Sequence, residues 1–312
     1  MQRRFSSLLA AVVLGISALT VAAPASAATT AAELVAVGDS VASGNGILPY
    51  LDEQCLRSKR SHAVLLAKEL GLSVRSAACS GANTQDALAQ IHGLGGSGVL
   101  GPATEIVTLS VGVNNVEWLA DGDADWVDTL IACSDAGLFP PNFCETAIGL
   151  SLLSLAPLPE KIAELIAAIR LYAPNAQVVV TGYAIPFGDV SGSCHVGLLD
   201  VPEIGVRQPL SFGETETDLI NAATVAANQL IAGGVAAYQA VAQVGDETVV
   251  YVDVNAVPAG VEGFEGHGLC DSDDRWVSGL LPRTAQTSDR GFHPNAAGQA
   301  AYADIIAATI GG

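Results

Sequence analysis

The chain has 312 residues, half of them hydrophobic, and a formal net charge of −19. This length allows one sizeable hydrophobic core, in one or two domains. The acidic balance repels nucleic acid and anionic membranes, and so argues against a polybasic binding module.

The first 27 residues have the pattern of a secretory signal peptide. Arg3 and Arg4 precede an apolar run at 8–23, and small residues follow that run. A membrane anchor is the alternative, but the apolar run is short for a span. We therefore expect cleavage after Ala27, an extracellular location and a single domain over 28–312. No later apolar run looks long enough to span a bilayer, so no stable membrane insertion is expected.

Short apolar runs alternate along the chain with longer stretches of helical character. Parallel strands joined by helical crossovers give this alternation, so we predict a three-layer α/β/α domain. Ligands bind beyond the carboxyl ends of such strands, which directs attention to the loops there. In chain order the predicted elements are strand 33–37, helix 59–70, strand 73–77, helix 84–91, strand 105–111, helix 157–172, strand 176–182, helix 215–240, strand 247–253 and helix 296–310. Ser58 and Asn295 are the expected N-caps of the first and last helix.

A serine follows the first predicted strand directly, in the tripeptide Gly38-Asp39-Ser40. A hydroxyl group there lies at the edge of the sheet, beside the N–H groups of the next helical turn. Such donors can stabilise an oxyanion. The alternative is an ordinary turn, because all three residue types favour turns.

Two further loops carry groups that suit an oxyanion hole. Gly81 lies in the loop after the second predicted strand, and Asn114 follows the third, after Gly112. A glycine N–H and a side-chain amide can both donate to a developing negative charge. Turn formation and helix capping are the alternative explanations.

A nucleophilic serine needs a base, and His293 is the best-placed candidate. It stands just before the last predicted helix, where the chain returns to the carboxyl edge of the sheet. His62 is expected to be structural because it lies within an amphipathic helix. His195 and His267 flank cysteines, and either substrate contact or loop packing would explain them.

Six cysteines, none in a C-x-x-C pair, fit disulfides in an oxidising compartment better than a zinc site. Their order suggests local bridges, with Cys133 and Cys144 closing a short loop. Fifteen connectivities remain possible from the sequence alone.

In this order, Gly38-Asp39-Ser40, Gly81, Gly112-x-Asn114 and His293 resemble the four motif blocks of the SGNH (GDSL) hydrolase superfamily. The segment "FEGHGLC", Trp276 and the six cysteines look closest to the secreted esterases and lipases of actinobacteria.

The resemblance implies a flavodoxin-like parallel sheet with strand order 2-1-3-4-5. It implies Ser40 as nucleophile, His293 as base, and an oxyanion hole made of the Ser40 N–H, the Gly81 N–H and the Asn114 side chain. It also implies three disulfides in sequence order, Cys55–Cys79, Cys133–Cys144 and Cys194–Cys270.

The sequence departs from the family pattern at two positions. Asn115 replaces the aspartate that usually follows the third-block asparagine, which predicts looser support for Asn114. The aspartate expected three residues before the histidine is Arg290 here. In some secreted relatives a main-chain carbonyl orients the histidine, so we expect the Arg290 carbonyl to do so. The alternative is Asp289, a carboxylate four residues before His293.

We therefore expect a secreted serine esterase or lipase that forms an acyl-enzyme intermediate, needs no metal or cofactor, and works as a monomer on a small-molecule or lipid ester. Apolar residues at 138–139, 143 and 147–158 either line an acyl groove or belong to the core. A carbohydrate deacetylase of the same fold and a non-catalytic binding module are the alternatives. A nucleotide-binding site is disfavoured, because the first turn lacks Gly-x-Gly-x-x-Gly.

Overall fold

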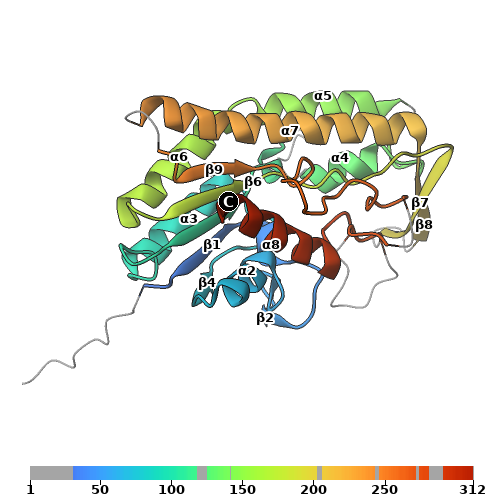
Figure 1. Ribbon diagram of the computed structural model, residues 1–312. Coiled ribbons are helices and arrows are strands. Elements are labelled where there is room, and N and C mark those ends of the chain that lie inside the picture. The colour runs from blue at the N-terminus through green and yellow to red at the C-terminus, as the bar shows by residue number, and fades with distance from the viewer. Residues whose placement is uncertain are drawn as a thin grey trace, which may run out of the picture.

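The computed structural model describes residues 31–117, 125–140, 142–201, 206–242, 246–271, 274–280 and 291–311. Figure 1 shows these residues as a central sheet with helices on both faces. The predicted signal peptide lies outside the described residues.

The central sheet has five parallel strands in the order β4-β1-β5-β6-β9, which is the predicted order 2-1-3-4-5. The central strands β1 and β5 are buried along their whole length. Burial on both faces explains the continuous apolar sequence of β1, whereas β5 also buries Thr108 and Ser110. The bounds are β1 Leu34–Gly38, β4 Val74–Ser76, β5 Ile106–Ser110, β6 Gln177–Thr181 and β9 Val249–Val252.

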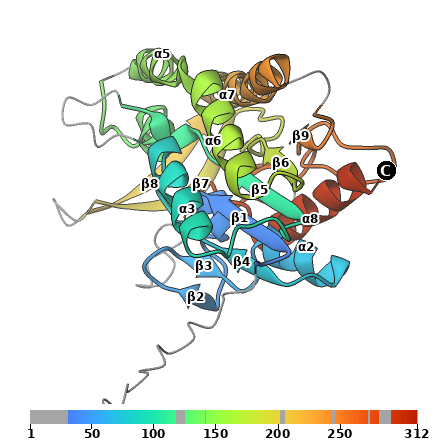
Figure 2. The ribbon, with the colours of Figure 1, turned by 90° about the vertical axis from the view of Figure 1, so that its left-hand side faces the viewer.

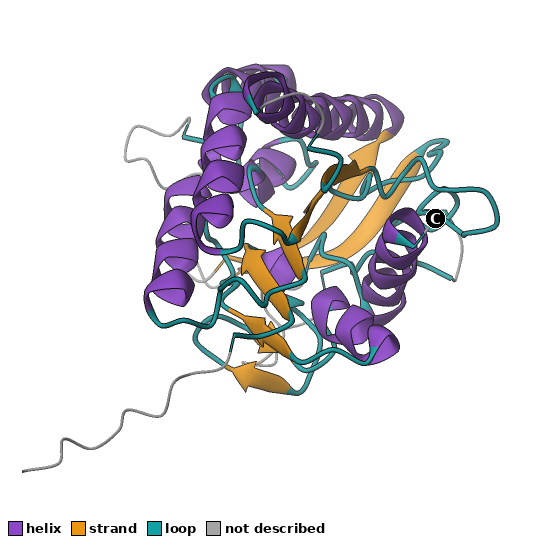
Figure 3. Ribbon diagram, turned by 60° about the vertical axis from the view of Figure 1, so that its left-hand side comes forward, coloured by secondary structure: helices purple, strands orange, loops and turns teal. Residues whose placement is uncertain are grey.

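Helices cover the two faces of this sheet. Figures 2 and 3 show one pair, α2 (His62–Leu70) and α8 (Ala296–Ile310), on one face. The other face carries α3 (Thr84–Gly96), α6 (Leu158–Tyr172) and α7 (Glu214–Val241). The three-layer prediction is therefore confirmed, as are the five predicted helices in kind and approximate position.

The predicted caps differ in outcome. The Asn295 side chain caps α8 by accepting hydrogen bonds from the Ala297 and Gly298 N–H groups. The prediction for Ser58 is wrong, because α2 begins three residues later and Ser61 is its N-cap residue. Ser58 ends the short strand β3 (Arg57–Ser58), which pairs with β2 (Tyr50–Asp52).

Several elements were not predicted from the sequence. Between the predicted strand at 176–182 and the predicted helix at 215–240 lies an antiparallel hairpin of β7 (Ser193–Val201) and β8 (Val206–Gly213). Two helices, α4 (Trp126–Ala132) and α5 (Phe143–Leu155), precede α6. Most of the apolar run at 147–158 is therefore α5, whose buried residues join the hydrophobic core.

Helix α7 corrects one expectation about membranes. Among the described residues it alone has the length and hydropathy of a membrane span. No segment of this kind was expected after the signal peptide. The buried residues of α7 pack in the core, and its main neighbours are α6 and α5. This packing is that of a core helix.

Three disulfides join the six cysteines in the order that the resemblance implied, Cys55–Cys79, Cys133–Cys144 and Cys194–Cys270.

Candidate active site

The turn after β1 places Ser40 at the carboxyl edge of the sheet. Gly38 has a φ of +136°, and a Cβ atom there would lie 2.0 Å from the Ser110 carbonyl oxygen, so only glycine fits. Asp39 then caps the four-residue helix α1 (Ser40–Ser43), because its Oδ1 accepts the Val41 N–H at 2.9 Å. Ser40 is the first residue of α1 and is partly exposed.

A buried hydrogen bond between Asp39 and Tyr183 stabilises this turn. Asp39 is fully buried, and the Tyr183 hydroxyl donates to its Oδ2 at 2.5 Å. Burial raises the pKa of Asp39 to about 6, although the bonds from Tyr183 and Val41 oppose that rise. The same hydroxyl accepts the Val113 N–H at 3.4 Å. Tyr183 thus links the turn that carries Ser40 to the turn that carries Asn114, a role that the sequence analysis missed.

The predicted oxyanion donors gather beside Ser40. The Ser40 and Gly81 N–H groups have no acceptor among the described residues, so both are free to bind a ligand. Gly81 has a φ of +83°, in the region that favours glycine. One hydrogen of the Asn114 amide is bonded to the Ala82 carbonyl oxygen at 3.0 Å, which holds the amide in place and leaves the other to donate.

Asn115, which replaces the family's aspartate and was expected to give Asn114 looser support, has a structural role of its own. It is buried, its Nδ2 donates to Thr84 Oγ1 at 2.8 Å, and its Oδ1 accepts the Thr84 N–H at 3.2 Å. The asparagine therefore ties the Asn114 turn to the start of α3. An amide in place of the carboxylate keeps both loops together.

His293 stands on a loop that backbone hydrogen bonds attach to the segment at 276–278. Its own carbonyl oxygen accepts the Ser278 N–H, and Asn295 N–H donates to the Trp276 carbonyl oxygen. The ring Nδ1 lies 2.8 Å from the Gly291 carbonyl oxygen. This contact fixes Nδ1 as the protonated nitrogen and leaves Nε2 as the basic one. Arg290, whose carbonyl was the predicted acceptor, lies outside the described residues.

Helix α8 connects the histidine loop to the serine turn. The Gln299 side chain donates from Nε2 to the Val41 carbonyl oxygen at 2.9 Å. Its Oε1 accepts the His62 N–H and also contacts the His62 ring. His62 is fully buried, and burial lowers its pKa to about 4, so it is neutral and structural, as expected.

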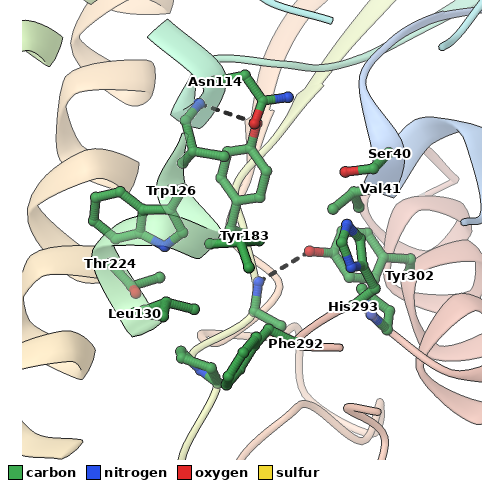
Figure 4. Close-up of a pocket in the computed structure, with 15 residues that line it drawn as sticks. Ser40, Val41, Asn114, Trp126, Leu130, Tyr183, Thr224, Phe292, His293 and Tyr302 are labelled. Carbon is green, nitrogen blue, oxygen red and sulfur yellow. Dashed lines mark hydrogen bonds between the residues drawn. The ribbon is translucent and has the colours of Figure 1, made fainter. Parts of the chain in front are cut away.

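Two cavities meet at these residues. Ser40, Asn114 and His293 line both of them, and Gly81 lines one. Figure 4 shows the first, here named the apolar cavity, with Ser40 and His293 on the side opposite Trp126 and Leu130. Its volume is about 60 Å³. The second, here named the polar cavity, has a volume of about 330 Å³ and includes Asn45, Ser80, Gly81, Asp125 and Ile131 in its wall.

Other residues singled out from the sequence lie elsewhere. His267 stacks on Trp276 with ring centroids 3.8 Å apart, and His195 contacts Ser211. Neither histidine lines the two cavities, and neither do Leu138, Phe139 or Phe143. Within the part of the chain that the structure describes, no group of three or more His, Cys, Asp or Glu side chains could hold a metal ion.

A comparison with family models matches residues 36–301 to the GDSL-like lipase/acylhydrolase family. The chain belongs to this family. The match spans every residue proposed for the site and agrees with the resemblance seen in the sequence.

Curated relatives support the same membership in the GDSL-like family. A protein named Lipase from Streptomyces rimosus is 32% identical over 273 residues, which is 86% of this chain and 83% of the relative. Lipase 1 from Streptomyces coelicolor is 32% identical over 292 residues, covering 91% of this chain and 89% of the relative.

Solved structures of similar proteins share the fold. The phospholipase A1 of Streptomyces albidoflavus NA297 aligns with a TM-score of 0.67 and 25% identity, over 89% of this chain and 99% of that one. The extracellular lipase of Streptomyces rimosus aligns with a TM-score of 0.65 and 28% identity, over 90% and 99%.

Proposed function

We propose that this chain is a secreted carboxylic ester hydrolase in which Ser40 forms an acyl-enzyme intermediate. The observation that carries the proposal is the meeting of Ser40, Asn114 and His293 at the walls of the same two cavities. A hydroxyl group, a side-chain amide and an imidazole from three separate loops meet the needs of acyl transfer.

In the first step Ser40 Oγ attacks the ester carbonyl carbon, and His293 Nε2 takes the hydroxyl proton. The carbonyl oxygen gains the negative charge and accepts hydrogen bonds from the Ser40 N–H, the Gly81 N–H and the Asn114 amide. Each such donor is worth roughly 3 kcal/mol of barrier. The imidazolium then protonates the alcohol oxygen as the C–O bond breaks.

In the second step a water molecule attacks the acyl-enzyme. His293 takes one proton from that water, the acid is released, and the proton returns to Ser40. The Gly291 carbonyl oxygen holds the Nδ1–H throughout, because it lies 2.8 Å from that nitrogen. Orientation by the Arg290 carbonyl stays a prediction.

The proposed substrates are fatty-acyl or lipid esters. Two relatives are named lipases and a structural neighbour is a phospholipase A1, which supports an ester of this class. Secretion is supported by the signal-peptide pattern of residues 1–27 and by the neighbour described as an extracellular lipase. A monomeric state stays a prediction.

Labelling with a fluorescent alkyl fluorophosphonate tests the nucleophile. The wild-type protein should incorporate one label, and peptide mapping should place it on Ser40. Ser40→Ala should abolish labelling, whereas Ser80→Ala should retain it, because Ser80 lines the polar cavity without being the nucleophile. A folded protein that takes up no label would support the non-catalytic binding module instead.

A further inference from the structure

The apolar cavity has three hydroxyl-bearing side chains in its wall besides Ser40, and each hydroxyl is already bonded within the protein. Tyr183 donates to Asp39 Oδ2, Tyr302 donates to the Gly182 carbonyl oxygen, and Thr224 donates to the Ile220 carbonyl oxygen. Away from Asn114 and His293, a ligand in this cavity therefore meets mainly ring faces and hydrocarbon, with the Trp126 indole at the far wall. A sugar or a polar head group would lose its hydrogen bonds to water there without replacing them.

The polar cavity, which shares Ser40, Asn114 and His293 with the apolar cavity, has a mixed wall that also includes Val127, Leu199 and Leu280. Asn45, Ser80 and Asp125 lie in its wall, and its volume of about 330 Å³ is several times larger. It also holds the Gly81 N–H. Polar groups of an alcohol can find hydrogen-bond partners on this side.

The far wall of the apolar cavity consists of side chains from α4 and α7. Figure 4 shows Trp126, Leu130 and Thr224 across the cavity from Ser40 and His293. Trp126 and Leu130 are 9% and 2% exposed, so both are held within the core. A chain that leaves Ser40 in this direction runs into that wall.

The volume of the cavity sets the length of chain that it can hold. One water needs roughly 10–15 Å³ of such space. A cavity of about 60 Å³ therefore has room for roughly four to six groups of that size.

We propose that the apolar cavity binds the acyl chain of the ester, that Trp126 and Leu130 end it after roughly four to six carbons, and that the alcohol lies in the polar cavity. The inference rests on the proposed function and narrows its substrates to short acyl esters. Within the cavity each methylene group adds about fourfold to kcat/KM, from the free energy of burying it.

The test measures kcat/KM for p-nitrophenyl esters from acetyl to dodecanoyl. For the wild-type protein kcat/KM should rise about fourfold per methylene group, reach its maximum between roughly four and six acyl carbons, and fall for longer chains. Trp126→Ala should move the peak to longer chains by two carbons or more. Ile131→Ala is the matched control on the same helix: its side chain lines the polar cavity, so the peak should stay in place.

Other results would overturn the inference. A wild-type peak at ten carbons or more, or an unchanged peak in a folded Trp126→Ala variant, would mean that this wall does not limit the chain. A shift in Ile131→Ala alone would place the acyl chain in the polar cavity. If Trp126→Ala does not fold, Thr224→Leu provides the test instead. Its larger side chain should narrow the cavity and move the kcat/KM peak to shorter acyl chains.

The alcohol side is tested with the acyl group fixed. Glyceryl butyrate should have a higher kcat/KM than hexyl butyrate, and the reverse order would remove the alcohol from the polar cavity. Failure of this inference is distinguishable from failure of the proposed function. A protein that is labelled by fluorophosphonate and hydrolyses esters without chain-length selection keeps the function and loses only the inference.

Discussion

The two halves of the candidate site are built in different ways. Ser40 and Asn114 lie within four residues of the central strands β1 and β5. The buried Asp39–Tyr183 bond holds both of their turns to the core. His293 instead stands about forty residues beyond β9. The serine half is thus fixed by the sheet itself, whereas the histidine half must be held by contacts between loops.

Those loop contacts join the histidine to the β7–β8 hairpin. Phe292 adopts a φ of +64°, which is strained for a large side chain, and its ring packs on Phe187 and Phe212. Isolated bridges link Val277 to Pro294 and Gly197 to Leu280. The disulfide Cys194–Cys270 joins the hairpin to the loop after β9. Several such contacts acting together hold the proposed base in place without a core strand.

The largest loss of activity is expected when one residue of either half is replaced. Ser40→Ala and His293→Ala should each lower kcat by about 10⁴-fold or more, and the double variant should be no slower than the worse single one, because the residues act as a unit. Steady-state kinetics with circular dichroism as a folding control checks this. A double variant that is far slower than both would show that the halves act independently.

Within the serine half, Asn114→Ala should lower kcat by about 10²–10³-fold with a much smaller change in KM, because it removes one oxyanion donor. Asn115→Ala is the neighbouring control. Its amide binds Thr84 in the structure, so the substitution should mainly lower the melting temperature. Equal losses of kcat in the two variants would argue against a distinct role for Asn114.

The histidine half should depend on its disulfide. The Cys194–Cys270 bond closes a loop of 76 residues, and Cys133–Cys144 closes one of 11. Replacing each pair by serine should cost about 4 and about 3 kcal/mol of unfolding free energy. At a temperature where both variants remain folded, only the first should lose activity, about tenfold, because only it loosens the His293 loop. Urea unfolding and esterase assays would show this, and equal activities would mean that other contacts suffice.

The buried carboxyl group of the serine half should make stability depend on pH. Asp39 has its pKa raised from 3.8 to about 6 in the folded state, so the native protein binds this proton more readily than the unfolded chain. The stabilising contribution is present below about pH 4 and is lost as the pH rises through about 6, which amounts to about 3 kcal/mol.

Asp39→Asn removes this titration while keeping an acceptor for the Val41 N–H. The difference in unfolding free energy between pH 4 and pH 7, measured by urea unfolding, should therefore change by about 3 kcal/mol relative to the wild type. Tyr183→Phe should act in the opposite sense, because it removes a bond that lowers the pKa of Asp39. An unaltered pH profile in Asp39→Asn would show that Asp39 does not titrate in this range.

The smallest expected effect concerns the acceptor for His293. Asp289→Asn should lower kcat less than about tenfold, far short of the roughly 10⁴-fold cost of losing a triad carboxylate. The reason is that the Gly291 carbonyl oxygen already accepts the Nδ1–H. A loss near a thousandfold with unchanged folding would identify Asp289 as a third catalytic member.

The sheet was predictable because its central strands are buried and because its short strands are separated by helices of clear periodicity. Helix α5 was not, because its apolar residues show no single face and no capping side chain marks its start; α8 lacks a single apolar face too, but Asn295 caps it. The β7–β8 hairpin was not predicted, because its sequence does not alternate regularly between apolar and polar residues. The site residues on strand ends were found from the same rule that places loops at the carboxyl edge. Tyr183 was missed, since its bond to Asp39 joins positions 144 residues apart and leaves no local pattern.

The hydrogen bond between the Gln299 side chain and the Val41 carbonyl oxygen joins residues 258 positions apart. The two parts of the site are therefore synthesised at different times. The ribosome makes Ser40 early, whereas His293 and α8 emerge last, and chains fold from the amino terminus as they are made. A nascent chain that stops short of His293 has the serine turn but neither the imidazole nor the glutamine that joins the two ends. In the proposed mechanism such a chain lacks the base, so ester hydrolysis is expected only after α8 has been made and has docked.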